Sequence, residues 1–222
     1  WTGDRHQRLE FGLSYEDQSL YHPIVDKILV DFDGPVPAQP VEVFSLLVDT
    51  DQRTWAGMVR YNIKLGDHDV LAGLNYADTH DAGGNFRNDG GHRNGQTDIV
   101  DNRSDSVEVF LVDRWTFAQD WTLVYGGQGV SSRRDVSTTD VATGFVSNPK
   151  GDYSSFNPRL GALYALSATN ELFASIGRLY EAPTNFELTD EVRGNNTLLD
   201  AMHGNVVEVG MRGSTPERAD AP

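Results

Sequence analysis

The side chains best suited to chemistry gather between Asp78 and His92, in a stretch dense in Asp, Asn and Gly. Hard oxygen ligands of the kind that Ca²⁺ prefers come from Asp78, Asp81, Asn88 and Asp89. The same residue types are the ordinary residues of turns, so a solvated loop is the competing interpretation. His80 and His92 make a weaker case for a transition metal. We keep the loop as our expectation, with no metal site, and leave Ca²⁺ as the alternative.

No catalytic motif stands out elsewhere. The 222 residues contain no Gly-x-Ser-x-Gly elbow, no His-Glu-x-x-His and no phosphate-binding glycine loop. The absence of cysteine excludes a disulfide framework and any Cys-based nucleophile or metal site. A net charge of -15 argues against nucleic acid as a partner, because nucleic-acid binding needs a basic surface. We therefore expect a protein that is not an enzyme and that carries no cofactor.

Apolar and polar residues alternate with a period of two along most of the chain, which predicts β-strands. In the first strand Leu9, Phe11 and Leu13 alternate with Arg8, Glu10 and other small or polar residues. Eight strands are expected in all, with a further short one at Val41–Val48. The eight are Gln7–Asp17, Thr54–Leu65, Asp69–Asp78, Ser104–Phe117, the segment from Trp121, the two halves of Phe156–Pro183, and Asn205–Gly213.

The predicted connections alternate between short and long. The short turns are Gly66–His68, Ala118–Asp120 and Ala168–Asn170. The long connections are Gln18–Arg53, Thr79–Arg103, Asp135–Tyr153 and Thr184–Gly204. Bacterial outer-membrane barrels have this asymmetry, with short periplasmic turns and long extracellular loops. No apolar run approaches the ~20 residues of a membrane helix, so a helical span is excluded.

Side-chain placement along these strands also fits a barrel wall. Aromatic residues lie near strand ends, where the two membrane interfaces would be: Tyr15, Trp55, Tyr76, Trp115, Phe117, Trp121 and Tyr164. One apolar face is expected to meet lipid, through Leu9, Leu13, Val59, Ile63, Leu74, Val109, Leu111 and Leu160. The opposite face carries several Arg and Glu residues. A wet lumen accepts such a face, whereas a soluble carbohydrate-binding β protein would need a dry core.

One stretch resembles a known family. The hairpin Phe156–Pro183 and the residues after it carry the pattern Asn157, Pro158, Arg159, Leu160, Gly161, Tyr164, Leu172, Phe173, Ala174, Gly177, Arg178, Ala182, Pro183, Thr184, Glu187 and Leu188. It resembles a hairpin of TonB-dependent outer-membrane receptors and covers some thirty residues. One position departs from the family, since Glu181 stands where a basic residue is usual.

The resemblance implies an all-β, antiparallel transmembrane barrel of about 22 strands with a plugged lumen. It also implies a transporter in the bacterial outer membrane that imports a scarce nutrient, most often a ferric siderophore, with energy relayed by TonB. The TonB complex would contact an N-terminal region beyond this chain. The lumen-facing rim positions that could bind ligand are Glu108, Gln128, Asn157, Arg159 and Glu181. Each has a structural alternative as a polar partner between neighbouring strands.

Residues 1–222 are therefore expected to form part of a barrel domain, without the plug domain and the remaining strands. The chain neither opens on a signal peptide nor ends on a strand with a terminal aromatic. We expect an open, curved sheet. A continuous ladder between the first and last strands would instead support a self-contained eight-stranded barrel with a structural or adhesive role in the outer membrane.

Overall fold

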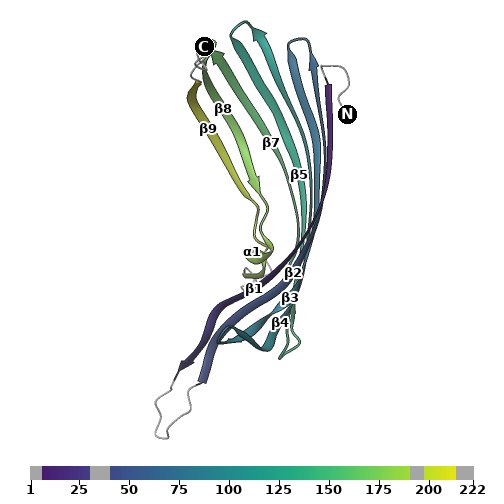
Figure 1. Ribbon diagram of the computed structural model, residues 1–222, viewed down its shortest axis with the longest axis vertical. Helices are drawn as coiled ribbons and strands as arrows, with labels where there is room; N and C mark the ends of the chain where they lie inside the picture. Colours follow the sequence, from purple (N-terminus) through teal and green to yellow (C-terminus); the bar gives the residue numbers. More distant parts are fainter. Residues whose placement is uncertain (1–6, 31–40, 191–197, 214–222) are drawn as a thin grey trace, which may run out of the picture.

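The chain forms one open, curved antiparallel sheet, seen in the computed structural model, which describes residues 7–30, 41–190 and 198–213 (Figure 1). Eight long strands follow the order β1-β2-β3-β4-β5-β7-β8-β9, and β6 pairs with β5. The expected eight-stranded barrel wall is confirmed. The elements are β1 (Gln7–Val30), β2 (Val41–Leu65), β3 (His68–Asp89), β4 (His92–Ala118), β5 (Trp121–Asp140), β6 (Val146–Ser147), β7 (Lys150–Ala165), β8 (Asn170–Glu181), α1 (Asn185–Asp190) and β9 (Met202–Gly213).

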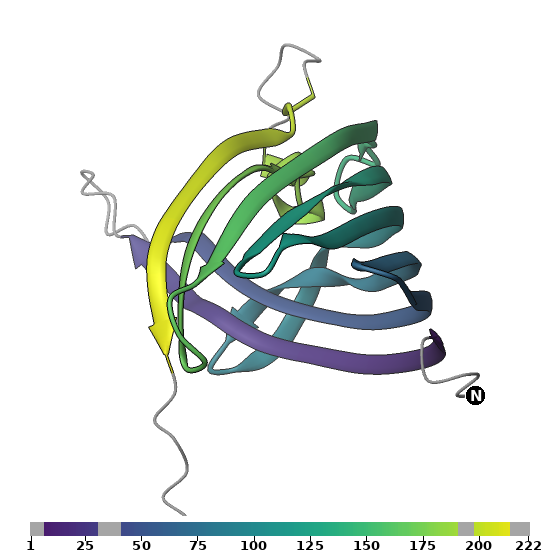
Figure 2. The ribbon, with the colours of Figure 1, turned by 90° about the horizontal axis from the view of Figure 1, so that it is seen from above.

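The sheet curls so that one face is concave, as the view from above shows (Figure 2). Among the described residues, β1 and β9 share no hydrogen-bond ladder and lie at opposite ends of the strand order. The prediction of an open sheet is therefore confirmed, and the self-contained barrel loses its main support. No helix in the described ranges is long and apolar enough to cross a membrane.

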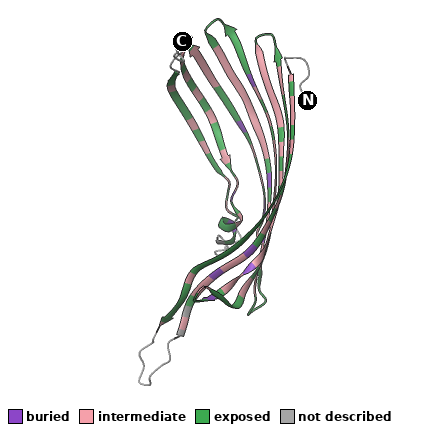
Figure 3. Ribbon diagram, viewed as in Figure 1, coloured by how far each residue is buried: buried purple, intermediate pink, exposed green. Residues whose placement is uncertain are grey.

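The pairing register carries the apolar residues onto the convex face. Val59 lies opposite Phe11 on one side and Leu74 on the other, and Leu74 lies opposite Val109. The same register places all eight residues predicted to meet lipid on this face. Six of these side chains are exposed, with Leu13 at 90%, and Leu9 and Ile63 are half-buried. Figure 3 shows exposed and half-buried residues alternating along a single layer.

Aromatic side chains border the apolar face at both ends. At the short-turn end, neighbouring rings run from His68 through Trp115, Phe117 and Trp121 to Tyr164, with centroids 4.7–6.4 Å apart. At the other end Tyr15 packs on Trp55 at 4.6 Å. Two such girdles around an apolar band characterise transmembrane barrels.

A polar cluster interrupts the apolar face near the short-turn end. Asp113 follows Leu111 on the convex side of β4, and it is only 5% exposed. Its Oδ2 atom accepts hydrogen bonds from Tyr125 Oη and His68 Nδ1, both at 2.7 Å. These contacts join β3, β4 and β5 and supply partners for a carboxylate that lipid could not solvate.

The predicted long loops prove to be mostly strand. The Thr79–Arg103 segment continues as β3 and β4 to a tight turn at Gly90 and Gly91, and much of Gln18–Arg53 belongs to β1 and β2. Most of Asp135–Tyr153 belongs to β5, β6 and β7, and Thr184–Gly204 contains α1. The strict alternation of short and long connections is lost, because β3 and β4 are joined by a turn as short as the one between β2 and β3. Most residues predicted as long loops extend the wall instead, because their backbone groups keep pairing across strands.

The turn between β3 and β4 is held against β1. Asn88 is buried, donates through Nδ2 to Val25 O (3.0 Å), and accepts from Gly91 N (2.9 Å). Gly90 N donates to Asp26 Oδ1 (3.1 Å). This set of contacts, which we call the hairpin clamp, holds the far ends of β3 and β4 against β1.

Replacing Val109 or Leu111 with Arg should destabilise the full-length protein in lipid by ~2–4 kcal/mol, because a guanidinium would face hydrocarbon. Val112→Arg is the matched control, since its side chain lies on the concave face of the same strand. Reversible unfolding from lipid vesicles measures the difference. Equal losses for inward and outward variants would show that the faces are assigned wrongly.

The hairpin clamp should weaken in acid. The Gly90 N–H, with that of Lys27, holds the pKa of Asp26 below its ordinary value. The stability that ionised Asp26 gives to the hairpin clamp is complete above the unfolded pKa of about 3.9. It is lost as the pH falls through the lower folded pKa. The hydrogen-exchange protection factor of the Gly90 amide should fall in that window. An Asp26→Asn variant with full protection at neutral pH would contradict this.

Candidate functional site

The concave face forms a groove of about 740 Å³ along β4, β5, β7, β8 and β9. Most of the polar side chains that line it come from positions of opposite parity to the apolar band, so they turn away from lipid. The polar and charged side chains that line it are Arg114, Gln128, Asn157, Arg159, Ser175, Arg178, Glu208 and Arg212. Apolar surface comes from Phe110 and Phe173 among others. Such a mixed lining can bind a ligand that carries both polar and apolar groups.

Gln128 and Asn157 lie side by side in this groove. They are direct partners in the β5–β7 ladder. Asn157 is 8% exposed, and its Oδ1 accepts a hydrogen bond from Ser155 Oγ at 2.9 Å. The Asn157 side chain therefore makes a contact within the wall, which fits the alternative that it has a structural role.

Arg159 occupies an open part of the same groove. Its ladder partners are Gly126 on β5 and Gly177 on β8, so no neighbouring side chain stands beside it in register. A Cβ at Gly126 would come within 2.1 Å of Leu111 O, so only glycine fits there without a backbone shift. The space around the Arg159 side chain is therefore open, because both of its ladder partners are glycines.

The other two predicted ligand residues lie elsewhere. Glu108 is on the concave face but accepts a hydrogen bond from Asn75 Nδ2 (3.1 Å) and borders a separate hollow toward β2 and β3. Glu181 lies at the end of β8, paired with Met202, and does not line the main groove. The structure therefore brings together Gln128, Asn157 and Arg159 but not the full set of five.

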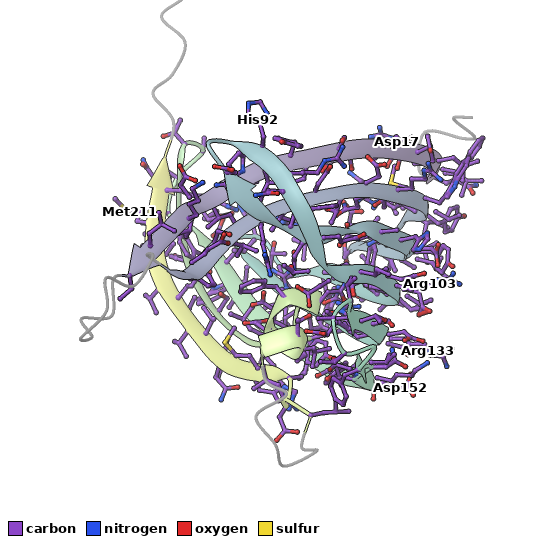
Figure 4. All side chains as sticks on the ribbon, turned by 90° about the horizontal axis from the view of Figure 1, so that it is seen from below. Asp17, His92, Arg103, Arg133, Asp152 and Met211 are labelled. Carbon is purple, nitrogen blue, oxygen red and sulfur yellow. The ribbon has the colours of Figure 1, made fainter. Side chains whose placement is uncertain are left out.

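We expected the predicted ligand residues to lie at the outer rim of the lumen, and this is wrong for Gln128 and Glu108, because their strands continue well beyond them. β5 continues beyond Gln128 to Asp140, and β4 begins well beyond Glu108, at His92. The groove therefore lies along the middle of the wall. On the convex side of the extended part, exposed charges such as Asp17, Arg103, Arg133 and Asp152 point outward (Figure 4).

The segment after β8 folds back toward the concave face, which the sequence analysis did not foresee. Leu188 of α1 and Val136 of β5 are both fully buried, and α1 packs against β5. Arg134 Nε donates to Pro183 O at 3.0 Å, and Tyr153 Oη donates to Leu199 O at 3.1 Å. The helix, Pro183 before it and Leu199 after it are therefore attached to the inside of the wall.

A capping box starts α1. Thr184 N donates to Glu187 Oε2 (2.8 Å), and Glu187 N donates to Thr184 Oγ1 (3.2 Å). The backbone hydrogen bond from Thr184 lowers the pKa of the Glu187 carboxyl. The Thr-x-x-Glu spacing is the sequence signal that could have predicted this helix start.

The four residues of the Ca²⁺ alternative do not converge on one point. Asp78 lies on the convex face and Asp81 on the concave face of β3, Asn88 is engaged in the hairpin clamp, and Asp89 pairs with Lys27 at 2.8 Å. Within the described part of the chain, no group of three or more His, Asp or Glu residues could hold a metal ion. Residues close in sequence are separated here because a strand sends successive side chains to opposite faces.

The wall, its two girdles and its polar concave face define a transmembrane β-barrel segment of the outer-membrane type. Residues 1–221 match the model of the family described as TonB dependent receptor-like, beta-barrel, and the chain belongs to that family. The search of curated proteins finds no match.

Solved structures share the fold. The unliganded ferric citrate transporter FecA has a TM-score of 0.71 at 16% identity, covering 96% of this chain and 30% of that one. FpvA of P. aeruginosa, bound to a heterologous pyoverdine and iron, has a TM-score of 0.69 at 18% identity, with 97% and 29% covered. The ferric-catecholate import receptor Fiu of E. coli K12 has 0.68 at 13%, with 98% and 37% covered. This chain thus spans about a third of their lengths.

Leu188→Ala should release the inward-folded segment, because it removes a fully buried side chain from the contact between α1 and β5. Amide hydrogen exchange over residues 185–190 should become faster in the full-length protein while β7 and β8 stay protected. Phe186→Ala is the matched control, since Phe186 is exposed on the same helix. Equal exchange in both variants would contradict the anchoring role.

Proposed function

We propose that this chain is part of the barrel wall of an outer-membrane active-transport receptor, which imports a scarce nutrient with energy supplied through TonB. The family match over residues 1–221 carries the proposal. The nutrient class that we infer is a ferric siderophore or a similar metal complex, since the structural neighbours include a ferric citrate transporter and a ferric-catecholate import receptor.

In this proposal each part of the wall has one role. The convex apolar face and its girdles contact outer-membrane lipid, and the concave groove faces the lumen and the passing ligand. Gln128, Asn157 and Arg159 are the proposed ligand contacts within the groove, and Glu108 and Glu181 are contacts outside it. The TonB complex acts through an N-terminal region of the whole receptor, and nucleic acid has no part. Transport needs no covalent chemistry, so the protein is not an enzyme.

Uptake of radioactive iron by the native bacterium under iron limitation tests this function. Deleting the whole gene should abolish uptake of at least one ferric complex, and removing TonB should have the same effect. Complementation with Gln128→Ala should lower the affinity for that complex, whereas Arg103→Gln on the convex face should not. Normal uptake of every ferric siderophore and ferric citrate offered to the deletion strain would refute the proposal.

A further inference from the structure

Among the described residues, two guanidinium groups line the groove without a hydrogen-bond partner, whereas a third, that of Arg178, contacts His203 Nδ1 at 3.2 Å. Within the described ranges, neither Arg159 nor Arg114 forms an ion pair or a side-chain hydrogen bond, although both border the groove. The other charged groups nearby are engaged: Arg212 Nε donates to Glu171 at 2.7 Å, and Glu208 accepts from Ser175 Oγ at 3.4 Å. Free positive charge therefore collects on one part of the concave wall.

The register places the two arginines on the same face of the sheet, on strands separated only by β5. Arg114 lies opposite Val124, Val124 lies opposite Gly161, and Arg159 is two residues from Gly161 along β7. The glycines at 126, 161 and 177 leave this part of the groove bare of side chains. Gln128 is the diagonal neighbour of Arg159, at the ~7–8 Å typical of such pairs.

An ionisable group at membrane depth is costly unless water, a partner or a ligand solvates it, so unpaired ones mark functional sites. A guanidinium presents a planar set of donors that matches a carboxylate or phosphate in two parallel hydrogen bonds. We propose that Arg159 and Arg114 form an oxyanion-binding site in the lumen, with Gln128 as a neutral polar contact. The inference rests on the proposed function, because it takes the concave face to line a lumen.

The anion has two possible sources with the same chemistry. It is either an acidic group of the transported ligand or a carboxylate of another segment of the same receptor that enters the lumen. Both would place a carboxylate-like oxygen pair on Arg159. If the anion belongs to the ligand, the site is open to solutes in the resting receptor. If it belongs to another segment of the receptor, that segment already occupies the site.

Cysteine reactivity in the membrane-assembled full-length receptor tests the site. Gln128→Cys places a thiol beside Arg159, to be labelled with an anionic (sulfonate) or a cationic (trimethylammonium) methanethiosulfonate. Adding Arg159→Gln should lower the anionic-to-cationic rate ratio by about threefold or more, because the field in a cleft concentrates anions. Arg159→Lys should preserve the ratio. Arg133→Gln on the exposed convex side is the matched control and should leave it unchanged.

If the thiol is protected from both reagents, a segment of the receptor itself occupies the site. In that case Arg159→Gln should lower the thermal midpoint of the receptor more than Arg133→Gln does. If the thiol is accessible, a rate ratio that Arg159→Gln leaves unchanged would overturn the oxyanion site. If the thiol is protected, equal thermal midpoints for Arg159→Gln and Arg133→Gln would overturn it. Iron uptake is measured separately, so loss of the proposed function and loss of this site are distinguishable.

Discussion

The fold depends on one constraint, which is that every backbone N–H and C=O at membrane depth must find a partner within the protein. The antiparallel ladder from β1 to β9 meets most of that requirement, although the two edge strands each lack one neighbour and β7 pairs with β8 only over Arg159–Ala165. The regular alternation of side chains follows, because the register shifts lie toward the strand ends and the central part of each ladder keeps the same parity across neighbouring strands. The two faces could not be so cleanly divided if the register slipped by one residue.

The division into two faces suits the sheet to the transport role that we propose. The convex face is apolar and ends in aromatic girdles, and a carboxylate that it carries, that of Asp113, accepts hydrogen bonds at Oδ2 from two side chains of neighbouring strands. The concave face is free to carry charge because water reaches it. Its glycines matter as much as its charged residues, since Gly126 keeps adjacent backbones close and leaves Arg159 uncovered.

Beyond the girdle that contains Trp55, the chain continues as paired strands and not as loops. Strand pairing continues there in water, where it is no longer obligatory, and it is reinforced by a small buried cluster. Leu47 is fully buried and Asn88 nearly so, and the hairpin clamp ties β3 and β4 to β1. The segment bearing α1 is held in a similar way on the inside of the wall. Side-chain contacts as well as strand pairing therefore fix the arrangement of the outer part of the protein.

The sequence by itself determined the strands within the membrane, the short turns, the girdles and the lipid-facing set, because each depends on local alternation and turn chemistry. The family hairpin determined the class of protein. Only the tertiary structure decided the rest. The Asp- and Asn-rich segment around Asp81 becomes strand because neighbouring strands accept its backbone hydrogen bonds, a contact that no local pattern records. The grouping of Gln128, Asn157 and Arg159 without Glu181 is likewise decided by the register and divergence of the strands, which sequence spacing does not contain.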